Sequence, residues 1–83
     1  MTKVELYTWT YCPFCIRAKA LLEEKNISYR EVIIDGDNEK KRELYENTGQ
    51  NTVPFIFING NFLGGYTELN TLEEQGELEK MIR

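Results

Sequence analysis

Short apolar runs alternate with longer amphipathic segments along the chain. Val4–Tyr7, Tyr29–Ile34 and Phe55–Ile58 have the length and the β-branched or aromatic content of strands. Phe55–Ile58 is wholly apolar, which is typical of a strand buried on both faces. Asn59-Gly60 is a strong two-residue hairpin signal, so Asn61–Leu63 is expected to return as an antiparallel fourth strand.

The segments between these strands have helical periodicity. From Pro13 to Asn26, apolar residues recur at the spacing of one helix face, namely Ala18, Leu21 and Leu22, with the stem of Lys25. A second helix is expected to start at Asn38 as its N-cap, with Leu44 and Tyr45 facing inward. Both helices would therefore present an apolar stripe to the sheet.

The third helix is expected to follow the last strand. Thr67 is a good N-cap, Leu69 and Leu72 fall on one face, and Gly76 ends or breaks the helix. A short last turn would then be packed by a final apolar group made of Leu78, Met81 and Ile82.

The element order is therefore β-α-β-α-β-β-α. The first two strands, joined through a helix, should be parallel by a right-handed crossover, and the hairpin adds two antiparallel strands. This order predicts a three-layer α/β sandwich around one mixed four-stranded sheet. The 83 residues fit a single domain, 1–83.

Composition narrows the classes of function. Hydrophobic residues make up 41% and charged residues 29%, which is ordinary for a globular domain. A net charge of −4 argues against a nucleic-acid surface, and no apolar run approaches the roughly 18 residues that span a bilayer. The first strand begins almost at Met1, which leaves no room for a signal peptide, so we expect a cytoplasmic protein.

The chain has two cysteines, Cys12 and Cys15, at the junction of the first strand and the first helix. Residues three apart in the first turn of a helix share a face, so the two sulfurs can meet the geometry of a disulfide. In the cytosol such a pair rests largely reduced and is usually catalytic. The spacing therefore favours a thiol–disulfide oxidoreductase.

The two sulfurs are expected to have different roles. Cys12 lies at the helix N-terminus, where free N–H groups and the helix dipole favour a thiolate, and it should be the more exposed. Cys12 is therefore predicted as the nucleophile and Cys15 as the resolving thiol. Two buried structural cysteines remain an alternative. A zinc site fails on ligand count and a Cys-His hydrolase on the absence of histidine, but a metal or iron–sulfur cluster shared between two chains stays open.

Two further motifs stand out. In Thr52-Val53-Pro54 the proline precedes a buried strand, where it is either a cis residue in a tight turn or an ordinary strand entry. In Gly64-Gly65-Tyr66-Thr67-Glu68 the glycines lead into a helix N-terminus, which is either a seat for a carboxylate or only a turn.

Together, Cys12-Pro13-Phe14-Cys15, Thr52-Val53-Pro54 and Gly64–Leu69 resemble the glutaredoxins, and the match covers essentially the whole chain. It is closest to small bacterial dithiol members, with phenylalanine where the family's usual Cys-Pro-Tyr-Cys has tyrosine. The resemblance implies a thioredoxin-like fold with strand order 4-3-1-2 and strand 3 antiparallel. It also implies a groove for glutathione.

The same resemblance implies roles for individual residues. Cys12 would form the mixed disulfide with glutathione, whose backbone would pair with Thr52 and Val53 beside a cis Pro54. The groove would be completed by residues of all three motifs and of the second helix: Phe14, Gly65 and Tyr66 as lining, Thr67 and Glu68 at the γ-glutamyl end, and Lys41 near the glycine carboxylate. Glutathione would be a co-substrate, with no tightly bound cofactor and no metal, and the protein would be a monomer.

Two residues depart from the family pattern. Trp9 stands where many relatives carry a lysine that attracts the tripeptide's carboxylate, so Trp9 is either an aromatic wall beside the groove or a residue packed against its rim. Thr67 stands where many relatives have serine or an acidic residue, which weakens the expected recognition of the glutathione amine.

The expected function is glutathione-dependent reduction of protein disulfides and of glutathione mixed disulfides, with disulfide-containing or glutathionylated proteins as partners. Trp9 gives some support to an alternative, an electron donor such as one to ribonucleotide reductase that is recharged by thioredoxin reductase. The third hypothesis is a non-enzymatic carrier of an iron–sulfur cluster or metal.

Overall fold

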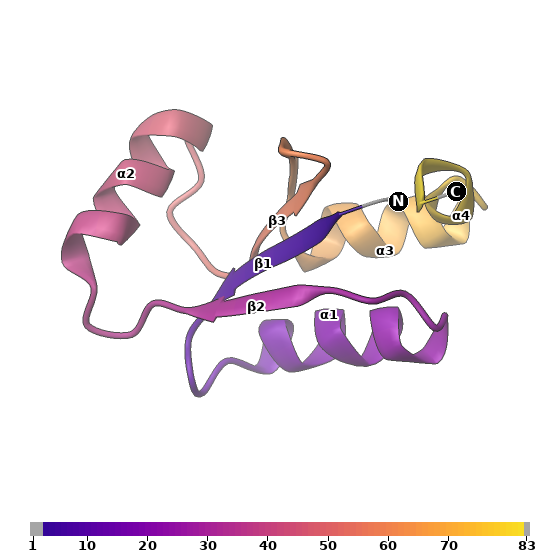
Figure 1. Ribbon diagram of the computed structural model, residues 1–83, viewed down its shortest axis with the longest axis horizontal. Coiled ribbons are helices and arrows are strands. Elements are labelled where there is room, and N and C mark those ends of the chain that lie inside the picture. The colour runs from indigo at the N-terminus through magenta and orange to yellow at the C-terminus, as the bar shows by residue number, and fades with distance from the viewer. Residues whose placement is uncertain (1–2, 83) are drawn as a thin grey trace.

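The computed structural model describes residues 3–82, which form a four-stranded mixed sheet with helices on both faces (Figure 1). The strands are β1 (Val4–Thr8), β2 (Arg30–Ile33), β3 (Phe55–Ile58) and β4 (Asn61–Gly64). Their order, β2-β1-β3-β4, with β1 parallel to β2 and antiparallel to β3, is the predicted order read from the other edge. Of the predicted domain 1–83, residues 1, 2 and 83 lie outside the described part.

The helices are α1 (Pro13–Glu24), α2 (Asn38–Thr48), α3 (Tyr66–Glu74) and the short α4 (Leu78–Ile82). In Figure 1, α2 stands at the left of the view, apart from α1, α3 and α4. Within residues 3–82 no helix has the length and apolar content needed to cross a membrane.

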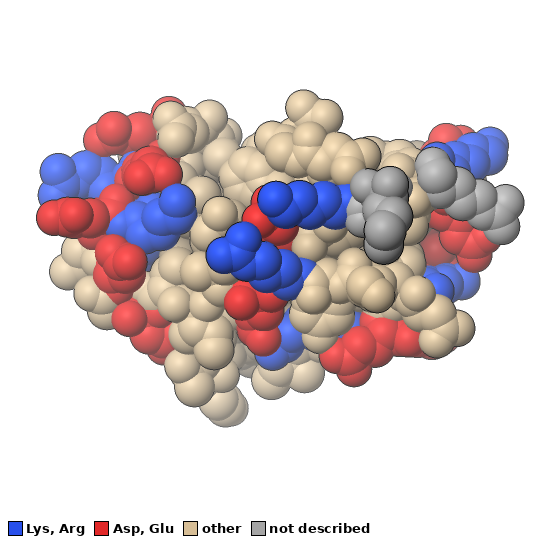
Figure 2. All heavy atoms as spheres, in the orientation of Figure 1, with Lys and Arg blue, Asp and Glu red and all other residues tan. Residues whose placement is uncertain are grey.

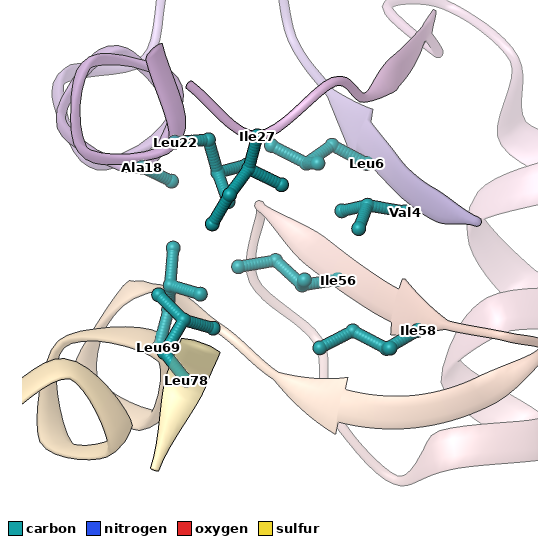
Figure 3. Close-up of a cluster of buried hydrophobic side chains, with 9 residues drawn as sticks. All are labelled: Val4, Leu6, Ala18, Leu22, Ile27, Ile56, Ile58, Leu69 and Leu78. Carbon is teal, nitrogen blue, oxygen red and sulfur yellow. The ribbon is translucent and has the colours of Figure 1, made fainter. Parts of the chain in front are cut away.

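One face of the sheet carries the larger core cluster. Because side chains alternate along a strand, Val4 and Leu6 of β1 point to the same face as Ile56 and Ile58 of β3. Helices α1, α3 and α4 cover this face with four apolar side chains and their neighbours, and Figure 3 shows them meeting the strands: Ala18, Leu22, Leu69 and Leu78. The predicted stripe on the first helix is therefore confirmed.

The opposite face holds a second cluster, which packs against α2. It contains Phe55, Val53, Ile34 and Leu44, together with both cysteines. The rings of Tyr7, Phe57 and Phe62 extend this cluster along the sheet. The reactive pair is thus built into the core rather than attached to its surface.

The turn between β3 and β4 has the conformation that its sequence predicts. Asn59 and Gly60 both have positive φ, 53° and 82°, as a two-residue turn of this kind requires. The Asn59 side chain also accepts a hydrogen bond from the backbone N–H of Lys3, at 2.9 Å. The hairpin is therefore fastened to the start of the chain.

Helix α2 differs from its prediction at two residues. Asp37, not Asn38, is the N-cap, because its side chain accepts a hydrogen bond from the backbone N–H of Lys40 at 3.0 Å. Tyr45 was expected to face inward, but it is 52% exposed. It follows the buried Leu44 by one residue and so points about 100° away around the helix.

The C-terminal helix also differs from its prediction. It begins at Tyr66 with Gly65 as the N-cap, so Thr67 is inside the first turn and is not the cap. Gly76, at φ 72°, separates α3 from α4, and Met81 is 41% exposed although it was expected to pack inward.

Glu68 determines the start of α3. Its carboxylate accepts a hydrogen bond from the backbone N–H of Gly65, at 2.7 Å, and so satisfies one of the free donors of the helix start. This contact requires Gly64 to have no side chain, because a Cβ there would lie 2.6 Å from Glu68 Cγ, at a φ of +136°. Gly64 is therefore needed for both backbone conformation and space.

The substitution Gly64→Ala should lower the free energy of unfolding by roughly 2–4 kcal/mol, because it combines an unfavourable φ with a steric clash. Gly36→Ala is the matched control, since Gly36 also has positive φ (74°) but nothing lies near its Cβ position. That variant should lose only about 1 kcal/mol. Urea denaturation compares the two, and equal losses would show that the clash with Glu68 is not a determinant.

Candidate active site

Cys12 is the N-cap of α1, with its backbone extended at φ −154° and ψ 109°. Its sulfur accepts a hydrogen bond from the backbone N–H of Cys15, at 3.2 Å. The thiol also lies 4.0 Å from the carbonyl oxygen of Val53, to which it can donate. The sulfur is thus placed between a helix start and the segment that precedes β3.

Cys15 is the more deeply buried of the pair, with 1% of the residue exposed against 6% for Cys12. Burial raises the pKa of the Cys15 thiol to about 12, and its interaction with Cys12 acts in the same direction. A hydrogen bond with the Trp9 backbone and the charge of Lys19 oppose this shift without cancelling it. At neutral pH Cys15 is therefore a protonated thiol next to the more accessible sulfur.

The loop before Cys12 is tied to the end of β2. The backbone N–H of Thr10 donates to the Asp35 carboxylate at 2.5 Å, and the Ile34 N–H donates to the Thr8 carbonyl at 2.8 Å. Asp35 is not among the site residues predicted from the sequence. Its only local signal is a carboxylate directly after a predicted strand.

The segment Thr52–Pro54 forms the other wall of the site. The Val53–Pro54 peptide bond is cis, one of the two conformations that the sequence left open. The side-chain amide of Gln50 donates to the carbonyl of Thr52 at 2.6 Å and to that of Pro54 at 2.9 Å. Gln50 is also absent from the predicted site residues, because nothing in the neighbouring sequence shows that its amide reaches forward to these carbonyls.

A groove of about 350 Å³ runs beside these two walls. Its lining contains all the predicted groove residues of the three motifs, together with Gln50: Phe14, Thr52, Val53, Pro54, Gly65, Tyr66, Thr67 and Glu68. The rings of Phe14 and Tyr66, which both line it, lie in a tilted contact with 6.3 Å between their centroids. The structure thus gathers residues from α1, the cis-proline segment and the start of α3 into one site.

Lys41, the remaining predicted residue, lines a separate hollow on the other side of Val53. This second hollow, which we call the aromatic hollow, has a volume of about 220 Å³ and is lined by Trp9, Lys41, Arg42, Tyr45, Asn51, Val53 and Phe55. The Lys41 ammonium lies 4.8 Å from the centroid of the Trp9 ring, which is a cation–π contact. Trp9 packs against the second core cluster and also lines the hollow. The two alternatives for this residue, a packed side chain and an aromatic wall, are therefore compatible.

The cations near the site form no ion pair with a carboxylate in the part of the chain that the structure describes. Ion pairs occupy six other lysine and arginine residues: Lys3, Lys19, Lys25, Arg30, Lys40 and Lys80. Figure 2 shows acidic and basic groups adjoining one another over one face of the molecule. Within the described part of the chain, Arg17, Lys41 and Arg42 form no ion pair. Arg17 instead lies over the Phe14 ring at 5.5 Å, so the free cations flank the two cavities.

Comparisons with known proteins agree with the motifs. The family model described as Glutaredoxin matches residues 4–63. Glutaredoxin 3 of Escherichia coli K12 is 42% identical over 83 residues, the full length of both chains. The crystal structure of a buckwheat glutaredoxin–glutathione complex superposes with a TM-score of 0.94 at 28% identity, covering 98% of this chain and 76% of that one.

A solution structure of glutaredoxin from Brucella melitensis has a TM-score of 0.88 at 39% identity, and the match covers 99% of this chain and 89% of the other. The predicted thioredoxin-like fold is therefore confirmed by neighbours of known structure as well as by the strand order. The predicted resemblance is confirmed too: the chain belongs to the glutaredoxin family.

Proposed function

We propose that this glutaredoxin is a glutathione-dependent thiol–disulfide oxidoreductase that reduces glutathione mixed disulfides and protein disulfides. One observation carries the proposal. The sulfur of Cys12 receives an N–H from the start of α1 and adjoins a groove, while a protonated second thiol lies one turn along the same helix. A nucleophile and a proton-bearing resolving thiol are the two parts that dithiol exchange needs.

The reaction on a glutathionylated protein is a sequence of two exchanges. The Cys12 thiolate attacks the glutathione sulfur, a new sulfur–sulfur bond forms, and the protein leaves as a thiolate that takes up a proton. A second glutathione thiolate then attacks the glutathione sulfur bound to Cys12. This step releases oxidised glutathione and restores the Cys12 thiolate.

Reduction of a protein disulfide uses both cysteines. Cys12 forms a mixed disulfide with the partner, and Cys15 then loses its proton and attacks the Cys12 sulfur. The partner leaves as a dithiol, while the enzyme is oxidised to a Cys12–Cys15 disulfide that two glutathione molecules reduce. The high pKa of Cys15 keeps this thiol unreactive until the first exchange has placed a disulfide beside it.

The cavities support a placement of glutathione in three parts. Its cysteine would pair with the backbone of Val53, next to the Cys12 sulfur. Its γ-glutamyl end would lie in the groove at Thr67 and Glu68, where the start of α3 favours a carboxylate. Its glycine carboxylate would point to Lys41, which forms no ion pair within residues 3–82. The bound glutathione named for the buckwheat relative supports this ligand.

The wider biological setting is also part of the proposal. We expect disulfide-containing and glutathionylated proteins as partners, and a monomer that works in the cytoplasm. The motifs of the groove favour glutathione over thioredoxin reductase as the reductant, since the groove is formed by the residues that would hold the tripeptide.

The substitution Cys12→Ser should abolish both reactions, because it removes the nucleophilic sulfur that lies 4.0 Å from the Val53 carbonyl at the groove wall. Cys15→Ser should keep the reduction of a glutathione mixed disulfide and lose most reduction of protein disulfides. Assays coupled to glutathione and NADPH-dependent glutathione reductase measure both activities. Turnover by Cys12→Ser would refute the assignment of roles, and activity with thioredoxin reductase alone would refute the reductant.

The difference between the two thiols gives a second prediction. Because burial raises the pKa of Cys15 to about 12, its thiol should stay protonated and unreactive at any pH below the ordinary thiol value of 9.0. Iodoacetamide should therefore modify the reduced protein at Cys12 and spare Cys15, as located by fragment mass spectrometry. In the Cys12→Ser variant Cys15 should remain unmodified over the same time, and rapid labelling of Cys15 would contradict the proposed roles.

A further inference from the structure

The aromatic hollow is larger than a glycine needs. It has a volume of about 220 Å³, and three of its walls are the rings of Trp9, Tyr45 and Phe55. Phe55 is already buried, at 2% exposure, but Trp9 is partly exposed and Tyr45 is 52% exposed. A glycine has no side chain to cover these two rings, so they would remain in contact with water after glutathione binds. Burial of apolar surface is favourable, so a ligand with an apolar side chain at this place would gain affinity.

The charges at the rim indicate what else the ligand carries. Lys41 and Arg42 lie side by side along α2 and line the hollow, and neither forms an ion pair among residues 3–82. The protein as a whole has a net charge of −4, so a local excess of free cations stands out. An apolar hollow with two free cations fits a residue that has an apolar side chain and a carboxylate beside it.

The hollow also has a fixed relation to the reacting sulfur. Val53 lines both the groove and the hollow, and its carbonyl oxygen lies 4.0 Å from the Cys12 sulfur. An extended peptide whose cysteine lies beside Val53, with its preceding residue in the groove, therefore passes its next residue to the hollow. This step rests on the function proposed above.

We propose that the aromatic hollow selects substrates in which an apolar residue directly follows the reacting cysteine and a carboxylate lies next to that residue. The apolar side chain packs between Trp9 and Tyr45 over Phe55, and the carboxylate meets Lys41 and Arg42. The substrate class is thus wider than glutathione. It includes peptide and protein thiols with the order cysteine, apolar residue, carboxylate.

The test compares two substrates, each a mixed disulfide between a peptide and cysteamine. The peptide is γ-Glu-Cys-Gly in the first and γ-Glu-Cys-Phe in the second. Replacing glycine by phenylalanine should lower KM about fivefold, because this is the gain in affinity expected from partial burial of the phenyl ring. The value of kcat should not change. Amidation of the terminal carboxylate of the phenylalanine peptide should raise KM again. Equal KM values for the two peptides, or a higher KM for the phenylalanine peptide, would overturn the inference.

Variants identify the surface responsible. Tyr45→Ala should remove the preference for phenylalanine, and since Tyr45 is half exposed the variant should fold. Met81→Ala is the matched control, because it removes another exposed apolar side chain from α4, which contributes nothing to the hollow. A preference that survives Tyr45→Ala would place recognition elsewhere. If the protein reduces neither peptide, the proposed function fails; if it reduces both equally, only this inference fails.

A second, independent observation concerns Gln50. Both N–H groups of its side-chain amide are used, one on the carbonyl of Thr52 and one on that of Pro54. Its backbone N–H donates to the Thr48 hydroxyl at 3.1 Å, and that hydroxyl donates to the Leu44 carbonyl at 2.7 Å. The residue is therefore held by α2 and in turn holds the segment beside the active site.

The carbonyls that Gln50 binds flank the one that faces the nucleophile. Gln50 fixes the peptide groups on both sides of the cis Val53–Pro54 bond, so it also restricts the orientation of the Val53 carbonyl between them. The Cys12 thiol lies against the Val53 carbonyl. We infer that Gln50 is a positioning residue that presents the peptide groups of Val53 to the substrate and to Cys12.

Three substitutions at Gln50 test this role. Gln50→Glu keeps the shape and loses both donors, so it should raise KM for a glutathione mixed disulfide about tenfold, as should Gln50→Ala. Gln50→Arg retains donors in a fork and should restore most of the affinity. A role in stability alone would lower the melting temperature and leave KM unchanged, and that result, or a normal KM in Gln50→Glu, would overturn the inference.

Discussion

The site depends on the placement of one sulfur atom. Cys12 Sγ lies 3.2 Å from the backbone nitrogen of Cys15, in the first turn of α1, and 4.0 Å from the carbonyl oxygen of Val53. The first neighbour is a donor that favours negative charge on the sulfur, and the second is a peptide group that can align a substrate beside it. Val53 lies 41 residues from Cys12 in the sequence, so the site exists only in the folded chain.

The sheet brings these segments together. β1 and β3 are antiparallel neighbours, with Tyr7 opposite Phe55, so β1 ends and β3 starts at the same end of the sheet. At that end the chain continues from β1 to Cys12, and Val53 and the cis Pro54 lie directly before β3. The second core cluster fills the space beneath and includes both cysteines. The packing that stabilises this face of the sheet therefore also positions the reacting groups.

Local sequence was sufficient for the element order and the mixed sheet, because their signals are contained in short segments, whereas the groove was predicted from the resemblance of the three motifs to a family. The strand periods and the Asn59-Gly60 turn each determine a local shape, and the strand order that the family resemblance implied is the observed one. The sequence did not distinguish Asp37 from Asn38 as the N-cap of α2, because both side chains can accept a hydrogen bond from the first turn of the helix. The contacts of Asp35 and Gln50 could not be predicted, because whether a polar side chain reaches a backbone group depends on the path of the loop between them.

Charge near the site is likewise a property of the tertiary structure. Many relatives place a lysine three residues before the nucleophile, and here that residue is Trp9. The folded chain nevertheless has a cation at this place, because the Lys41 ammonium of α2 lies over the indole ring at 4.8 Å. An aromatic face can hold an ammonium without neutralising it, whereas a carboxylate would cancel its charge. Trp9 therefore supplies both an apolar wall and a support for a charge that comes from another element, which a lysine at the same position could not do.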